Sequence, residues 1–267
     1  MFKRYEFSEK DFIVLFAYAK KKKILCFATP QNISGMRMLL RLDTPLLKVG
    51  SDDLTNIPLL EEYARTKLPV IISTGMASLA EVKDAVHVFR KAGNDKLIIL
   101  HCISSYPARA DELNLRRIKT LQSTFGTIVG FSDHSLGVTA GVAAAALGAK
   151  VIEKHFTLDK GLPGPDHSFS ADPKELKALV EGVRAVEKAL GKADIRPSRK
   201  EKRMRLLARR SIVVARAIAK SETITSDMIE YKRPGTGLMP KQTKLIIGKR
   251  SKHALKRGEL IRLKNVV

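Results

Sequence analysis

The chain has 267 residues, of which 44% are hydrophobic and 28% charged, a composition typical of a folded globular protein with room for one large and one small domain. No run of about 18 apolar residues occurs, and residues 1–6 lack the apolar core of a signal peptide, so we expect neither a membrane-spanning helix nor a secretory leader. The formal net charge is +22, and residues 196–267 hold 21 Lys and Arg against 5 Asp and Glu. Such a basic segment attracts anionic partners. No zinc-finger spacing or aromatic–basic RNA motif accompanies it, so we do not expect nucleic acid to be the partner.

Short apolar runs of strand type alternate with helical patterns along the first two thirds of the chain. Strands are predicted at residues 24–28, 45–51, 69–73, 96–101, 128–131 and 151–152. Helices are predicted at residues 7–23, 33–42, 58–66, 113–125, 139–147 and 175–190, and one more begins after Ser78, which caps it with Glu81. Six strand-then-helix units with short connections indicate a parallel sheet covered by helices. An eight-stranded barrel is the candidate, with two strands unaccounted for, unless the sheet is open.

The composition changes after the last long helix. Residues 193–210 are highly charged and read as a linker, and residues 211–267 read as a small β-rich domain with Pro/Gly loops. Residues 1–192 would then form the barrel domain. Cys26 and Cys102 lie in apolar strand-type runs, so we expect two buried thiols in a reducing cytoplasm rather than a disulfide.

Polar residues follow two consecutive predicted strands. Ser132, Asp133 and His134 leave the first, and Glu153 and His155 leave the second. Because successive parallel strands end at the same edge of the sheet, these side chains should gather there. Two imidazoles can hold a divalent metal, with carboxylates or water completing the coordination. The alternative is two unrelated histidines, one in the core and one in a loop.

Several short stretches taken together match one family. They are residues 27–30, 48–51, 72–76, 101–102 with 105–107, 130–134, 152–156 and 164–167, followed by residues 209–211 and 232–235 near the C-terminus. In these stretches the chain resembles the sialic acid synthases, a group that includes N-acetylneuraminate, legionaminic and pseudaminic acid synthases. The resemblance implies an α/β TIM-type barrel that lacks its first two strands, plus a small C-terminal antifreeze-like (SAF) β-rich domain. It runs over nearly the whole chain and does not identify the sugar.

The resemblance implies a reaction as well as a fold. The family condenses phosphoenolpyruvate with an N-acetylated aldose of the N-acetylmannosamine type, giving a nonulosonic acid and phosphate. A divalent metal, manganese or magnesium, polarises the sugar aldehyde. Carbon 3 of the enol attacks this carbonyl, water adds to carbon 2, and phosphate leaves. The family also implies a domain-swapped homodimer without membrane attachment.

Metal and phosphoenolpyruvate positions carry over residue by residue. His134 and His155 match the metal ligands. The phosphoenolpyruvate-binding positions are matched by Thr29, Lys48, Ser51, Ser73 and Ser132. Hydroxyls and an ammonium suit a trianionic substrate, although Ser73 could instead cap a helix. Ser104 stands where the best-known members carry asparagine.

The remaining matches concern the sugar. Asp53, Tyr106 and Glu153 match acid–base or sugar-contacting positions that we expect to be catalytic, and Asp166 matches a substrate-binding position. Arg233 matches an arginine that reaches the sugar in the partner's barrel, although it could be an ordinary basic loop residue.

Two other functions compete with this reading. A synthase remnant without its first two strands could be inactive and bind anionic ligands through its basic C-terminal segment. A Schiff-base aldolase would use Lys48 or Lys154 as its amine. Lys154 alternates with Glu153 and His155 and should face the helix layer, whereas Lys48 should face inward.

Overall fold

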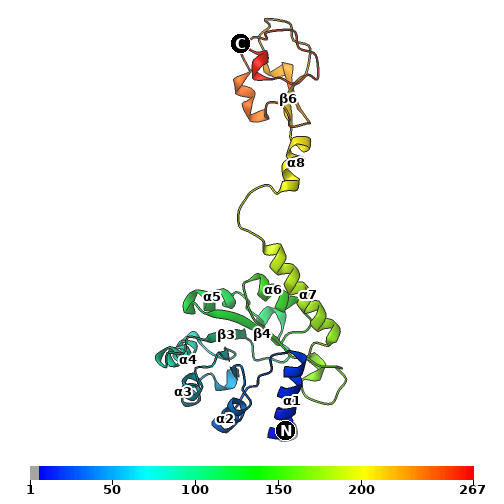
Figure 1. The fold of residues 1–267 in the computed structure, drawn as a ribbon. Helices are drawn as coiled ribbons and strands as arrows, with labels where there is room; N and C mark the ends of the chain where they lie inside the picture. Colours follow the sequence, from blue (N-terminus) through cyan, green and yellow to red (C-terminus); the bar gives the residue numbers. More distant parts are fainter. Residues whose placement is uncertain (1–5) are drawn as a thin grey trace. The chain divides into compact units, whose positions relative to one another are not determined.

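The computed structural model describes residues 6–267, and the chain divides into two compact units, Met1–Gly191 and Lys192–Val267 (Figure 1). Within the described residues no helix is both long and apolar enough to cross a membrane. The first unit contains a parallel sheet with helices between its strands, and the second contains a small antiparallel pair of strands. Each unit has its own cluster of buried apolar side chains.

The sheet of the first unit has five parallel strands in the order β1-β2-β3-β4-β5. The strands are β1 Leu47–Val49, β2 Val70–Ser73, β3 Leu97–Cys102, β4 Ile128–Asp133 and β5 Ile152–Lys154. The helices are α1 Glu9–Lys22, α2 Ile33–Arg41, α3 Ile57–Arg65, α4 Leu79–Lys91, α5 Arg117–Phe125, α6 Thr139–Ala146 and α7 Pro173–Leu190. Each strand pairs with the next one in the chain, and a helix connects them, which is the topology of a partial TIM-type barrel.

Local sequence signals explain where several helices begin and end. The predicted capping box is confirmed: the Ser78 hydroxyl accepts a hydrogen bond from the Glu81 N–H, and the Glu81 carboxylate accepts one from the Ser78 N–H. Asp172 and Glu175 form the same box at the start of α7. Helix α5 ends at Gly126, which has a φ of 64°, a left-handed conformation that glycine adopts without steric cost. These local signals fix where α4 and α7 begin and where α5 ends.

The sheet curves strongly although it is not closed by strand pairing. β1 and β5 are its two edges, yet the Lys48 ammonium on β1 lies 3.7 Å from a carboxylate oxygen of Glu153 on β5. A flat sheet of five strands would separate these edges by about 19 Å, because neighbouring strands lie about 4.8 Å apart. The curvature therefore turns side chains from all five strands toward a common interior.

The prediction of a strand at residues 24–28 was wrong, and the sheet has five strands rather than six. Ile24 and Leu25 are largely exposed, with 66% and 74% of their surface accessible. The Ile24 N–H donates to Ala19 O at the C-terminal end of α1 instead of to a sheet neighbour. An apolar run becomes a strand only where a neighbour satisfies its backbone groups and covers its side chains. Pairing of this kind is absent at residues 24–28.

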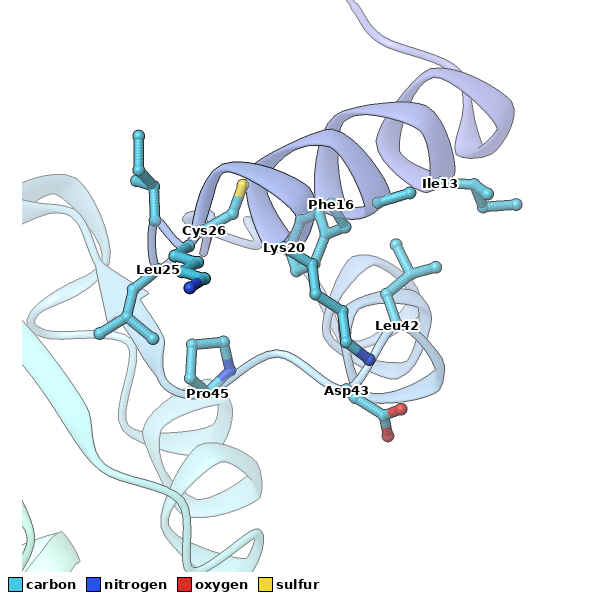
Figure 2. A pocket seen from close by; sticks show the side chains of 11 residues that line it. Ile13, Phe16, Lys20, Leu25, Cys26, Leu42, Asp43 and Pro45 are labelled. Carbon is cyan, nitrogen blue, oxygen red and sulfur yellow. The ribbon is translucent and has the colours of Figure 1, made fainter.

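Residues 24–26 instead line an open cavity beside α1. Its volume is about 560 Å³, and Ile13, Phe16, Leu25, Leu42 and Pro45 contribute apolar walls (Figure 2). Cys26, expected to be buried, lies in this lining and is partly exposed, whereas Cys102 is buried as expected. The predicted first helix forms, but none of its residues in α1 is buried.

The second unit is small and rich in short β elements. Helix α8, Arg199–Ala208, begins at a Ser198–Glu201 capping box within the residues predicted as a linker and buries no residue. β6, Ser211–Val214, pairs antiparallel with β7, Ile229–Lys232. The apolar core of the second unit consists of Ile212, Val214, Ile218, Ile224, Met228, Ile246, Leu255, Ile261 and Val266.

His101 on β3 faces the helix layer and gives a stability prediction. Its ring stacks on Phe131 with centroids 5.8 Å apart, and its Nε2–H donates to Leu113 O over 2.7 Å. Burial lowers the pKa of His101, and the positive charge of Arg117 lowers it further. The unfolded chain, with a His pKa of about 6.5, therefore binds the proton more readily than the folded chain. Folding stability should be retained above that pH and lost as the pH falls through it.

We expect the substitution His101→Gln to reduce the decrease in the free energy of unfolding that occurs as the pH falls. Urea unfolding between about pH 5 and pH 7.5 measures it, with exposed His87→Gln as the control that keeps the wild-type slope. Parallel profiles for wild type and His101→Gln would contradict the assignment.

Candidate active site

Polar side chains from four strands meet at the interior of the curved sheet. Lys48 donates a hydrogen bond to Ser73 Oγ over 2.8 Å, and the Ser132 hydroxyl donates to Glu153 Oε1 over 2.6 Å. The Lys48–Glu153 approach of 3.7 Å joins these two pairs. These four residues come from β1, β2, β4 and β5, so the strands rather than flexible loops position them.

Lys48 is the buried cation of this interior. Only 6% of the residue is exposed, and its ammonium also donates to Val49 O over 3.0 Å. A buried charge is stable only when hydrogen bonds and opposite charges replace water. Glu153 supplies the opposite charge, and 39% of its side chain remains exposed. An anion entering the site would therefore meet an ammonium that is already held in place.

The two histidines of the predicted metal pair lie side by side. Their ring centroids are 5.4 Å apart with the planes at 70°. Two imidazoles bound to one ion place their centroids at most about 6 Å apart, given metal–nitrogen bonds of about 2 Å. His134 donates Nδ1–H to Ile103 O over 2.7 Å, which leaves Nε2 as the nitrogen for an ion, and the His155 Nδ1 lies 3.6 Å from Asp166 Oδ2. A carbonyl or carboxylate partner of this kind is the usual support of a metal-bound histidine.

Few side chains near the histidine pair could bind a metal ion. Within residues 6–267 no group of three or more His, Cys, Asp or Glu side chains has the spacing of a metal site. Two imidazoles with water or substrate oxygens in the remaining positions suit a catalytic ion that keeps open coordination positions. The arrangement of His134 and His155 fits this type of ion.

An aromatic wall borders the histidine pair. The Tyr106 ring lies 4.3 Å from the His134 ring and 5.7 Å from the His155 ring, and Phe169 lies 5.2 Å from His155. Burial raises the pKa of Tyr106, and the nearby Cys102, Asp166 and Glu153 raise it further. Tyr106 is therefore a neutral phenol at neutral pH and can donate a hydrogen bond.

A second group of small polar atoms lies around Gly75, in the turn after β2. The Gly75 N–H donates to Ser51 Oγ over 2.9 Å, and Ser51 Oγ lies 3.6 Å from Cys102 Sγ. The Ser104 hydroxyl is buried and has no hydrogen-bond partner. A Cβ at residue 75 would lie 2.2 Å from Ser104 Oγ and 2.7 Å from Ser51 Oγ. A buried hydroxyl without a partner is costly, which makes Ser104 available to a ligand.

Cys102 was predicted only as a buried thiol, but it also borders this site. Its sulfur lies 3.9 Å from His134 Nδ1. Burial alone would raise the pKa of the Cys102 thiol, but hydrogen bonds with His134, Ser51 and Ser132 outweigh it and lower the pKa below its usual value. The alternation of His101 and Cys102 along β3 was the available signal, because it turns one of them inward.

Not every predicted site residue joins this cluster. Thr29 is exposed and lines a different cavity of about 770 Å³ next to Asn32. Asp53 accepts a hydrogen bond from Asn56 over 3.0 Å, within its own turn. Arg233 directly follows β7 in the second unit and is exposed. The structure brings the other predicted residues, from Lys48 to Asp166, to the carboxyl ends of the strands.

Comparison with known proteins identifies the family of each unit. Residues 1–195 match the NeuB family, and residues 209–267 match the SAF domain. The chain belongs to the NeuB family. The family comprises sialic, legionaminic and pseudaminic acid synthases, so the resemblance noted in the sequence is confirmed.

Individual relatives extend over both units of this NeuB-family chain. An uncharacterized protein of Methanocaldococcus jannaschii is 45% identical over 98% of this chain and 77% of its own length. The N,N'-diacetyllegionaminic acid synthase of Legionella pneumophila is 41% identical over 97% of this chain and 74% of its own. The N-acetylneuraminic acid synthetase structure from Leptospira borgpetersenii superposes with a TM-score of 0.71 at 42% identity, over 74% of this chain and 70% of that one. This NeuB-family chain is thus a homologue of legionaminic and N-acetylneuraminic acid synthases.

Proposed function

We propose that this chain catalyses the condensation of phosphoenolpyruvate with an N-acetylated aldose of the N-acetylmannosamine type, giving a nonulosonic acid and phosphate. The observation that carries the proposal is the joint placement of a buried ammonium, several hydroxyls and a histidine pair at the carboxyl ends of adjacent strands. Lys48 carries the buried ammonium, and His134 and His155 form the histidine pair. An anionic substrate and a carbonyl substrate can meet between them.

Phosphoenolpyruvate would bind on the side of β1 and β2. Lys48 offers a fixed positive charge, and Ser73, which accepts from Lys48, keeps its own hydroxyl proton to donate. Ser132 on β4 donates to Glu153 and would turn from this partner to contact the substrate. Ser51 and the partnerless Ser104 add two more hydroxyls around Gly75. Charge-assisted hydrogen bonds of this type bind phosphate and carboxylate groups strongly. Thr29, which lies apart in this structure, is proposed as a further contact on the basis of the family match alone.

The sugar would bind on the side of the histidines. His134 and His155 would hold a divalent manganese or magnesium ion, which supplies Lewis-acid polarisation of the sugar aldehyde when bound. Tyr106, a neutral phenol against both rings, would donate a hydrogen bond to a sugar oxygen. Asp166 would hold the His155 ring and contact the sugar.

Glu153 would handle the proton of the attacking water. Carbon 3 of phosphoenolpyruvate forms the new bond to the aldehyde carbon, and the aldehyde oxygen becomes a hydroxyl. The proton of that hydroxyl comes from solvent. Water then adds to carbon 2 and gives one proton to Glu153; as the bond from carbon 2 to the phosphate oxygen breaks, the second proton of the water passes to the departing phosphate and the carbon 2 ketone remains. Glu153 is partly exposed and accepts the Ser132 hydroxyl, so it can reach such a water. Asp53 is proposed as a further acid–base residue on the family match alone.

The aldolase alternative is weakened by the positions of the two lysines. Lys154, with 4% of its side chain exposed, pairs with Asp133 on the helix-layer side of the sheet, as predicted, and no substrate can reach its amine. Lys48 does face the interior, as predicted, but its nitrogen lies 3.7 Å from the Glu153 carboxylate and donates to Ser73 Oγ. A Schiff-base lysine must lose its proton to react.

We also propose a homodimer in which Arg233 contacts the sugar bound by the partner subunit. Family membership and the exposure of this residue support it. Mixing Arg233→Ala protein with His134→Ala protein tests the proposal, because a mixed dimer would regain one intact site. A mixture as inactive as its two components would contradict it.

The direct test of function is phosphate release. The purified chain is incubated with phosphoenolpyruvate, manganese and, separately, N-acetylmannosamine and the diacetylated sugars that lead to legionaminic and pseudaminic acid. We expect release with one sugar and none after chelation of the metal. If no sugar supports release but phosphoenolpyruvate still raises the melting temperature, the chain is an anion-binding relative rather than a synthase.

Substitution at Gly75 tests the phosphoenolpyruvate side. The added Cβ in Gly75→Ala would displace the Ser51 and Ser104 hydroxyls, and overpacking of about 1–3 kcal/mol corresponds to a loss of affinity of about tenfold or more. Titration calorimetry with phosphoenolpyruvate measures it. Gly35→Ala is the matched control, because its Cβ would meet nothing closer than 3.5 Å. Equal affinities for the two variants would rule out a role for the Gly75 turn.

A further inference from the structure

A buried ion pair immediately precedes the two histidines in the chain. Asp133 Oδ2 and Lys154 Nζ lie 3.0 Å apart, and their side chains are 0% and 4% exposed. The two residues are direct partners in the ladder between β4 and β5. His134 and His155 are the next residue on each strand.

The ion pair is fully hydrogen-bonded by its surroundings. Asp133 Oδ1 accepts from the Ser135 N–H over 2.9 Å and from the Ser135 hydroxyl over 2.6 Å. Lys154 also donates to the Ser135 carbonyl. Asp133 and Ser135 are the residues before and after His134, and both bond to Lys154 on β5. The backbone on each side of His134 is therefore tied to β5. A network in which every buried polar atom has a partner is rigid.

Helix α6 closes the pair off from solvent. A Cβ added at Gly141 would lie 3.7 Å from Asp133 Oδ2 and 2.7 Å from Leu179 Cδ1, so the helix backbone lies directly against the pair. The pair is therefore on the face of the sheet opposite to Ser132 and Glu153, away from the proposed substrates.

The Asp133–Lys154 pair lies at the end of the pairing between β4 and β5. The ladder between β4 and β5 runs from Phe131–Ile152 to Asp133–Lys154, and Asp133–Lys154 is its last pair. Beyond it the histidines leave the sheet, and their carbonyls accept from other segments, Ala108 N for His134 and Ala171 N for His155. The ion pair thus joins the two strands at their last ladder position, directly before the two histidines.

We propose that Asp133 and Lys154 are positioning residues that set the separation of the His134 and His155 rings. Neither residue contacts a substrate or the ion. Their role is to fix the two strand ends so that both imidazole rings face the same position between them. As far as it concerns a metal, this inference rests on the proposed function, but the ring separation itself does not.

The test measures manganese binding rather than turnover. Lys154→Met and Asp133→Asn each remove one charge of the pair, and electron paramagnetic resonance of free manganese gives the Kd. We expect the Kd to rise about 10- to 100-fold, the usual effect of losing a group that orients a ligand. Lys154→Arg, which keeps the charge and the N–H donors, should recover part of the affinity.

Val82→Ala serves as the control for a general loss of stability. Val82 is buried in α4, far along the chain from both histidines, so it should lower the melting temperature without changing the manganese Kd. If Lys154→Met behaves like Val82→Ala, the pair is merely structural and the proposal fails. Asp133→Asn, which keeps the shape of the side chain, carries the test if Lys154→Met does not fold.

A second measurement separates this proposal from the proposed function. If the wild-type protein binds no manganese, the metal role is wrong, and metal-free crystal structures of wild type and Asp133→Asn decide the positioning role. A change of about 1 Å or more in the ring separation, the size of misplacement that matters in active sites, supports it. Unchanged rings overturn it.

Discussion

Replacing His134 by alanine is expected to lower the rate of phosphate release by about a thousandfold or more. The loss follows if the histidine pair holds the ion that polarises the aldehyde, because such polarisation contributes several kcal/mol and each 1.4 kcal/mol is tenfold in rate. His155→Ala should have the same effect. The double variant should be no worse than either single one, since two ligands that act as a unit are not additive.

The fold should survive these substitutions. His134 and His155 lie at the rim of the sheet, and neither belongs to its buried apolar core. Circular dichroism should therefore change little, while bound manganese disappears from the resonance spectrum. The melting temperature of His134→Ala should fall, because the substitution removes a buried ring and its hydrogen bond to Ile103 O. His87→Ala, an exposed histidine on α4, should keep full activity and full manganese binding. A His134→Ala protein that still binds manganese as tightly as wild type would refute the metal pair.

The sequence predicted the face of some strand residues and missed another. Alternation along the strand turned Glu153 toward the interior and Lys154 toward the helices, and the structure agrees. This works because the period of a strand is two residues in every environment. The family resemblance and the partial barrel were likewise predictable from short stretches of residues. Asp133, which was expected to gather with the other site residues, faces the helices instead and pairs with Lys154.

Contacts that depend on the shape of the whole sheet were not predictable. The approach of Lys48 to Glu153 joins the two edge strands, and only the curvature of the sheet creates it. The partnerless hydroxyl of Ser104 similarly depends on how closely the Gly75 turn approaches it. The false strand at residues 24–28 has the same origin, because local apolar character does not reveal whether a neighbouring strand is present.

Replacement of Lys48 by methionine is expected to weaken phosphoenolpyruvate binding by about 100-fold. The ammonium donates to Ser73 Oγ and Val49 O and lies 3.7 Å from the Glu153 carboxylate. Methionine fills a similar volume but leaves Glu153 facing the substrate without its cation. Losing a charge-assisted hydrogen bond costs about 1.5–3 kcal/mol, and repulsion between two anions adds to it, which together correspond to about two orders of magnitude.

The control and the competing mechanism can be examined in the same experiment. Lys150→Met removes an exposed lysine just before β5, at the opposite end of the sheet, and should bind phosphoenolpyruvate as wild type does. Calorimetry without metal compares the three proteins, so the result does not depend on turnover. Borohydride reduction of the wild type with pyruvate should leave Lys48 unmodified, because its nitrogen is already engaged by Ser73 and lies 3.7 Å from the Glu153 carboxylate. A trapped adduct on Lys48 would instead assign the site to a Schiff-base aldolase, and an unchanged affinity of Lys48→Met would remove this lysine from the anion site.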